Sequence, residues 1–177
     1  MTVVHSTDPT TQVLSLLYQQ REDIKALITD RDTSSAVQRA IRADDVIMML
    51  GHGNRYGLFS KPDKNGKYER FMITGKHVQF LRGKTCIGIW CYANMFAEKY
   101  GLRGLFSGMI VSELQEAIDL GIPATKEETD KEIEKFTIRL RHCMEIYGLE
   151  QTPARMRELD DVRSALTTFN YSSLYYY

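Results

Sequence analysis

The 177-residue chain is 43% hydrophobic and 10% aromatic, which is enough apolar material for the core of one ordinary domain. Its 23 Lys and Arg residues balance its 23 Asp and Glu residues, so the formal net charge is zero. Nucleic-acid binders usually carry a basic excess, and we therefore expect no nucleic-acid partner. The start of the chain lacks a basic and apolar leader, and no apolar run approaches the length of a membrane span, so we expect no membrane association.

The three cysteines are Cys86, Cys91 and Cys143. Their odd number and irregular spacing are not typical of a disulfide framework, which favours a reducing compartment and hence a cytoplasmic location. Without a Cys-x-x-Cys pair, and with only four scattered histidines, the sequence gives no reason to expect a bound metal. The turn after the first expected strand contains no glycine, which excludes a dinucleotide-binding loop, and we expect no cofactor.

Short apolar runs alternate with helical patterns over the first two thirds of the chain. The expected strands, in chain order, are Thr2–His5, Asp23–Thr29, Asp45–Leu50, Thr85–Trp90 and Leu105–Val111. The expected helices are Thr10–Gln20, Thr33–Arg42, Thr74–Leu81, Asn94–Tyr100, a long helix from Thr125 to about Tyr147, and a last helix from Thr152 to about Thr168. The polar insert 61–67 interrupts this pattern, and we expect a hairpin around it formed by Leu58–Ser60 and Arg70–Ile73.

The alternation of strands and helices with short connections predicts an α/β fold with a mainly parallel central sheet and helices on both faces. The unbroken apolar runs of the third and fourth strands are typical of strands buried on both sides, and we expect these two strands to be neighbours. We interpret residues 1–177 as one domain, with the sheet core and candidate site in 1–113 and C-terminal helices in 114–177. Functional sites of such sheets lie at the carboxyl ends of the strands.

Two strand ends carry reactive side chains. The third expected strand stops at Gly51-His52-Gly53, and the fourth stops at Cys91. Cysteine catalysis needs a thiolate, an imidazole that manages protons, and donors for the oxyanion, so His52 and Cys91 form a candidate pair. Cys91 also precedes an expected helix, whose N-terminus should lower the pKa of the thiol. We assign Cys86 and Cys143 to the core.

The segments Val46–Gly53, Gly57-Leu58 and Ile87–Ala93 resemble the caspase-like clan of cysteine peptidases. This clan includes caspases, metacaspases, gingipains, clostripain and CHAT domains, and it places a His-Gly pair after its third strand and its nucleophilic cysteine after the fourth. The form Gly-His-Gly followed by Gly-Leu is similar to the CHAT and gingipain-like branches. The resemblance covers about the first two thirds of the chain and implies a caspase-like three-layer sandwich.

The resemblance also implies roles for particular residues. His52 would act as general acid and base, Cys91 as nucleophile, and the N–H groups of Gly53 and Cys91 as the oxyanion hole of an endopeptidase with a polypeptide substrate. Asn54 and Glu113 are weaker candidates for substrate binding. The chain departs from the clan at Ile89, where relatives that cleave after basic residues carry an acid, and it lacks the Gln-Ala-Cys-x-Gly sequence of caspases.

Two other functions stay open at this point. A caspase-like module without catalytic activity could act as a scaffold or regulator, since clan members of this kind exist. An esterase-like α/β hydrolase would need a Gly-x-Ser-x-Gly elbow, and the nearest candidate, around Ser107, lacks the first glycine. We therefore favour a cysteine endopeptidase with a His/Cys dyad.

Overall fold

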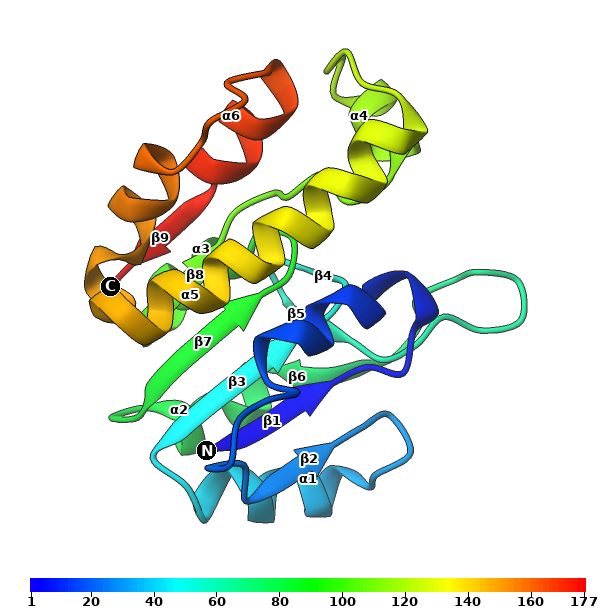
Figure 1. Cartoon of the computed structure of the whole chain (residues 1–177). Coiled ribbons are helices and arrows are strands. Elements are labelled where there is room, and N and C mark those ends of the chain that lie inside the picture. The colour runs from blue at the N-terminus through cyan, green and yellow to red at the C-terminus, as the bar shows by residue number, and fades with distance from the viewer.

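A six-stranded sheet forms the centre of the computed structural model, which describes all residues, 1–177 (Figure 1). Its order is β2-β1-β3-β7-β8-β9, in which every neighbouring pair is parallel except β8 and β9. The strands of this sheet are β1 (Thr2–His5), β2 (Ala26–Ile28), β3 (Val46–Leu50), β7 (Thr85–Ile89), β8 (Arg103–Ser107) and β9 (Leu174–Tyr176). The expected α/β fold with a mainly parallel sheet is confirmed, and so is the pairing of the third and fourth expected strands, β3 and β7.

Helices cover both faces of this sheet, and β3 shows why its sequence is apolar throughout. Met48 and Leu50 belong to the cluster that packs against η1 and α5, whereas Ile47 and Met49 belong to the cluster on the opposite face with α1, α2 and α3 (Figure 1). All four are fully buried. The helices are η1 (Pro9–Leu17, a 3₁₀ helix), α1 (Ser34–Arg42), η2 (Gly75–His77, also 3₁₀), α2 (Val78–Leu81), α3 (Ala93–Tyr100), α4 (Leu114–Asp119), α5 (Lys126–Glu158) and α6 (Ala165–Ser172).

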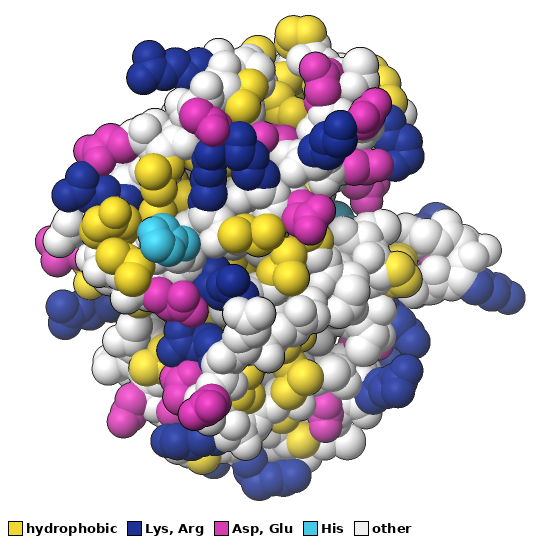
Figure 2. Space-filling model, viewed as in Figure 1, with side chains coloured by type: hydrophobic (Ala, Val, Ile, Leu, Met, Phe, Trp, Pro, Cys, Tyr) yellow, Lys and Arg dark blue, Asp and Glu magenta, His cyan; other side chains and the backbone are white.

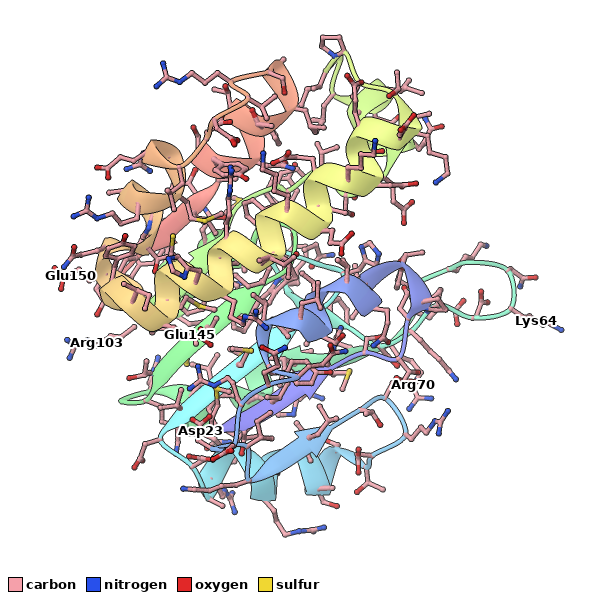
Figure 3. All side chains as sticks on the ribbon, in the orientation of Figure 1. Asp23, Lys64, Arg70, Arg103, Glu145 and Glu150 are labelled. Atoms are coloured by element: carbon pink, nitrogen blue, oxygen red, sulfur yellow. The ribbon has the colours of Figure 1, made fainter.

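A second, three-stranded antiparallel sheet follows β3. Its strands are β4 (Gly53–Asn54), β5 (Gly57–Phe59) and β6 (Phe71–Thr74). The expected hairpin around the polar insert is thus confirmed as the β5–β6 pair. The insert projects from the body of the molecule, with Lys64 at its tip (Figure 3), and Lys and Arg side chains mark this projection on the surface (Figure 2).

The fifth strand was expected at Leu105–Val111 but lies at Arg103–Ser107. The chain leaves the sheet after Ser107, and Ile110 and Val111 bury their side chains against helices instead. The side chain of Asn170 donates to the carbonyl of Val111 and accepts from its N–H, at 2.9 and 2.8 Å. A side-chain amide from α6 thus replaces the strand partner that an apolar run would otherwise need.

The C-terminal third agrees with the expectation in part. The long helix breaks at Gly148, whose left-handed φ of 76° interrupts the helical geometry next to the expected end at Tyr147. The helix that follows through Pro153 ends at Glu158 and not at about Thr168, and α6 is a separate helix. Residues 174–176 are not part of a helical region but form β9, which pairs antiparallel with β8. A three-residue strand at the end of a sequence has no periodicity to reveal it, because its pairing depends on a strand about 70 residues away.

None of the helices combines the length and the apolar character that crossing a membrane would require. On the face drawn in Figure 2, positive and negative side chains are mixed, and no large area carries a single sign of charge.

Candidate active site

The candidate pair lies at the ends of adjacent strands that finish at the same level. Leu50, the last residue of β3, pairs with Ile89, the last residue of β7. The N–H of Gly51 continues this ladder by donating to the carbonyl of Ile89 at 3.2 Å. His52 and Cys91 each follow two residues after the paired ends, and neighbouring strands lie about 4.8 Å apart. The register therefore delivers the imidazole and the thiol to the same edge of the sheet.

A narrow cleft opens at this edge, and both His52 and Cys91 border it. Its walls come from four regions: η1, the ends of β3 and β7, the segment after β8, and the middle of α5. Most of the side chains that line it are apolar, among them Leu14, Ile110 and Phe136. The cleft thus combines a small number of polar groups with an apolar interior, which is typical of small-molecule and peptide side-chain sites.

The imidazole of His52 is held by the loop that follows β1. Its Nε2 lies 2.8 Å from Oγ1 of Thr10, and this hydroxyl donates to Oδ1 of Asp8 at 2.9 Å. The second carboxylate oxygen of Asp8 lies 4.0 Å from the same Nε2. Because β1 is the other neighbour of β3 in the sheet, His52 stands between Asp8 on one side and Cys91 on the other.

This chain of hydrogen bonds fixes the tautomer of His52. The Thr10 hydroxyl has one proton, which it gives to Asp8, so it can only accept from the imidazole. Nε2 therefore carries a proton and donates it to Thr10, which leaves Nδ1 as the ring nitrogen that can exchange a proton. No hydrogen bond joins the imidazole to the Cys91 thiol in this arrangement. His52 is consequently set up to receive a proton at Nδ1 while Asp8 faces the opposite side of the ring.

Asp8 is buried but remains a carboxylate. Burial alone would raise its pKa, yet hydrogen bonds from the Tyr68 hydroxyl, at 2.6 Å, and from the N–H and hydroxyl of Thr10 outweigh burial and lower the pKa. Tyr68 follows the projecting insert, and its ring lies 5.3 Å from the ring of His52. Burial and the bond to Asp8 raise the pKa of Tyr68, so it stays a hydrogen-bond donor.

The Cys91 segment is fixed by the end of β8. Ser107 Oγ donates to the carbonyl of Trp90 at 2.8 Å and accepts from its N–H at 3.0 Å, while the N–H of Tyr92 donates to the carbonyl of Gly108. Tyr92 itself has a left-handed φ of 66°, which is unfavourable for a residue with a side chain. Backbone strain of this kind directly after a nucleophile candidate is typical of functional sites.

The pKa of the Cys91 thiol is not lowered, as the helix-start argument predicted, but raised to about 12. Burial is the largest cause, and the nearby carboxylate of Glu116 adds to it, while the backbone N–H groups of Ile110 and Cys91 act in the opposite direction. Helix α3 begins only at Ala93, and the strained Tyr92 stands between the helix and the thiol. Cys91 is therefore a neutral thiol in this state of the molecule.

Gly53 must be a glycine because of Trp90 and not because of its backbone angles. A Cβ at this position would lie 2.2 Å from Cδ1 of Trp90 and 2.6 Å from the carbonyl oxygen of Gly57. The Trp90 indole N–H also donates to the carbonyl of Asn54 at 3.1 Å. Trp90 thus ties the hairpin that carries His52 to the strand end that carries Cys91. At Gly51, by contrast, a φ of 142° requires glycine.

The N–H groups of Gly53 and Cys91, which were predicted to form the oxyanion hole, take no part in hydrogen bonds between neighbouring strands. Phe59 donates to the carbonyl of His52, so residues 52 and 59 form a hydrogen-bonded pair of the β4–β5 ladder. The next pair, Gly53 and Leu58, is then of the type whose N–H groups point away from the partner strand. The N–H of Cys91 donates to no backbone carbonyl, although both of its chain neighbours are hydrogen-bonded.

The weaker substrate-binding candidates lie outside the cleft lining. The side-chain oxygen of Asn54 accepts from the N–H of Tyr56 within the β4–β5 turn. Glu113 caps the start of α4 and lines a neighbouring groove. Cys86 and Cys143 are fully buried, as expected for core residues, and no group of three or more His, Cys, Asp or Glu side chains is placed to hold a metal ion.

Sequence reasoning missed Asp8, Thr10, Tyr68 and Ser107, which position the candidate pair. The segment Thr7-Asp8-Pro9-Thr10 has the pattern of a turn and a helix cap, and Asp8 does cap η1 by accepting from the N–H of Thr10. The signal in the sequence that could have identified Asp8 was its position directly after β1, the strand that neighbours β3. No known family profile matches the sequence, and a search of curated proteins returned no match, so the function must be argued from this geometry.

We expect iodoacetamide to label Cys91 before Cys86 or Cys143, because the last two are fully buried whereas Cys91 borders the cleft. Only the thiolate reacts, so a pKa of about 12 predicts a labelling rate that rises about tenfold per pH unit from neutral to mildly alkaline pH. Peptide mapping by mass spectrometry measures both quantities. A rate that is already constant at neutral pH would contradict the neutral thiol.

The substitution Gly53→Ala should destabilise the protein by about 1–3 kcal/mol, since the added methyl group overlaps Trp90 and backbone. Urea unfolding measures the loss, and the fluorescence of Trp90, the only tryptophan, should shift with it. Gly66→Ala is the control for the emission, because a Cβ there meets nothing within 4 Å and its φ of 76° causes backbone strain alone, so any loss of stability should leave the Trp90 fluorescence unchanged. Unchanged emission and unchanged stability in Gly53→Ala would show that Trp90 does not lock the hairpin.

Proposed function

We propose that this protein is a cysteine endopeptidase of the caspase-like type, with Cys91 as nucleophile and His52 as general acid and base. The observation that carries the proposal is the matched register of Leu50 and Ile89, which brings His52 and Cys91 to the border of one cleft at the carboxyl edge of a parallel sheet. Three further features support it: an imidazole bonded through Thr10 to a carboxylate, a strained residue after the thiol, and the N–H groups of Gly53 and Cys91, which donate to no neighbouring strand.

The reaction begins with a proton transfer. His52 Nδ1 takes the proton of the Cys91 thiol while the new positive charge is stabilised through Thr10 and the carboxylate of Asp8. The sulfur then forms a bond with the carbonyl carbon of the scissile peptide, and the N–H groups of Gly53 and Cys91 donate to the resulting oxyanion. The C–N bond breaks as His52 gives its proton to the leaving amine.

A thioester between Cys91 and the acyl part of the substrate remains. His52 then takes a proton from water, the water oxygen bonds to the acyl carbon, and the S–C bond breaks to release the acid and restore the thiol. Asp8 is not protonated in any step, because its role is to orient the imidazole and to stabilise its charged form. This role is the reason why a buried carboxylate with a lowered pKa is useful at this position.

The raised pKa of Cys91 favours a second candidate function, that of a caspase-like module without catalytic activity. In a peptidase, substrate binding would have to exclude water and bring the peptide into contact with the pair before the thiol loses its proton. In a non-catalytic module, the thiol would stay neutral with any peptide bound. The two candidates differ in whether an electrophilic peptide becomes attached to Cys91.

For the peptidase, Cys91→Ala should abolish cleavage of a mixed peptide library, and His52→Ala should lower kcat by roughly 10²–10⁴-fold, the range of general acid–base catalysis. Both variants should keep the fold, since each residue follows the end of a strand. Product formation is followed by mass spectrometry, with Cys86→Ala as a cysteine control outside the site. Full activity in Cys91→Ala would sink the proposal, and a wild-type chain that neither cleaves peptides nor reacts with peptidyl acyloxymethyl ketones would favour the non-catalytic module.

Thr10→Val should lower kcat by about 10- to 100-fold with little change in KM, because the link between His52 and Asp8 is lost while the cleft keeps its shape. Thr10→Ser keeps the hydroxyl and should retain most of the activity. Steady-state kinetics of the two variants separate orientation of the imidazole from packing. Activity that is kept in Thr10→Val but lost in Thr10→Ser would show that the methyl group of Thr10, and not its hydroxyl, is what matters.

A further inference from the structure

The cleft beside Cys91 selects the side chain of the substrate. We infer that it accepts an aliphatic or aromatic side chain, so that the peptides bound here carry an apolar residue next to the scissile bond. This inference rests on the proposed function for its meaning in catalysis, but it makes a separate claim about binding. It deepens that function by naming the side chain that the substrate carries before the scissile bond. The sequence left this preference open, because Ile89 stands where relatives that cleave after basic residues carry an acid.

The chemistry of the cleft lining carries the inference. Eight of the thirteen lining residues are hydrophobic, and none of the thirteen is Asp, Glu, Lys or Arg. The only ionisable side chains at its border are His52 and Cys91 themselves, which belong to the catalytic pair. A charged side chain that entered would lose its hydration without gaining a partner, and this loss is far larger than the gain from burying its methylene groups.

The side chains that form the walls of the cleft are packed into the hydrophobic core. Leu14 from η1, Ile110 after β8, and Ile133 and Phe136 from α5 all belong to the main core cluster on this face of the sheet. Each is at most 8% exposed, and Phe136 is fully buried. The apolar surface of the cleft is therefore a continuation of the core and not a loose patch of surface side chains. A peptide side chain would have to push these core side chains apart to enter the narrow cleft, and the surface that it met would still be apolar.

The acidic residues nearby lie outside the cleft. Glu113 and Glu134 line a separate groove that shares Thr10, Val13 and Ile133 with the cleft and runs outward between α4 and α5. The Glu116 carboxylate lies nearer to Cys91, but it does not line the cleft, and it already accepts hydrogen bonds from Ser112 and from the N–H of Glu113. A basic side chain in the cleft would therefore find no free carboxylate as a partner. The arrangement consequently argues against cleavage after lysine or arginine, even though Glu113 is close in sequence to the end of β8.

Binding can be measured without catalysis because Trp90, the only tryptophan, lines the cleft. In Cys91→Ala, blocked dipeptide amides ending in Leu, Phe, Lys or Asp are titrated while the Trp90 fluorescence is followed. We expect saturable changes with Leu and Phe, with affinities about 10- to 100-fold higher than for Lys or Asp. Equal or tighter binding of the charged peptides would overturn the inference, and so would the absence of any response to all four.

Charge placed in the wall should reverse the preference. Val13→Asp, at a half-buried position of η1, and Ile133→Glu, on α5, should weaken binding of the Leu peptide and strengthen binding of the Lys peptide. Ile138→Glu is the matched control, because Ile138 lies on the same helix but is 42% exposed and does not line the cleft. Circular dichroism confirms folding, and the titration of Cys91→Ala decides the matter if a wall variant is unfolded. A control that switches preference as strongly as the wall variants would contradict the assignment.

Reaction of the wild-type chain with acyloxymethyl ketones keeps the two claims apart. Probes with Leu at the first position should label Cys91 faster than probes with Lys or Asp. If the Leu peptide binds Cys91→Ala but no probe labels the wild type, the proposed peptidase function fails while the apolar cleft stands. If the Lys or Asp probes label fastest, the peptidase stands and the apolar selection is wrong.

Discussion

The parallel pairing of β1, β3 and β7 is the constraint on which the rest of the site depends. His5 pairs with Leu50, and Leu50 pairs with Ile89, so three neighbouring strands end at one level. Each end is followed within two or three residues by a polar or reactive side chain, which gives the spatial order Asp8, His52, Cys91. Since side chains on a strand alternate between faces, a slip of one residue would exchange the two buried faces of β3 and separate this group.

The same register is maintained by contacts that cross between the elements of the site. Ser107 from β8 holds both backbone groups of Trp90, and the Trp90 indole reaches the hairpin that starts after His52. Thr10 and Tyr68 approach from the other side and complete the hydrogen bonds of Asp8. The imidazole is thus oriented by groups from η1 and from the segment before β6, whereas the thiol is oriented by β8. The imidazole and the thiol at the cleft are thus positioned by different elements of the fold.

The chemistry of this arrangement depends on two acids whose pKa values move in opposite directions, because hydrogen bonds outweigh burial at Asp8 but not at Cys91. Asp8 is buried with three donors and keeps a lowered pKa, whereas Cys91 is half-buried near Glu116 and the pKa of its thiol rises. A charged orienting group and a neutral thiol can therefore exist a short distance apart. The apolar wall provided by η1 and α5 adds to the burial of Cys91, and the same wall is the surface that a substrate side chain would contact.

The sequence by itself determined the first four strands of the central sheet, the approximate place of β8, the helices up to α3 and the two strand ends that carry His52 and Cys91. These follow from local patterns: apolar runs of strand length, caps, and glycines at turns. Only the tertiary structure decided the roles of Asp8, Thr10 and Trp90, the raised pKa of the thiol and the pairing of β9. Each of these depends on groups that are distant in the chain and meet only after folding, as when residue 10 bonds to residue 52, and neither burial nor such contacts leave a periodic signal in the sequence.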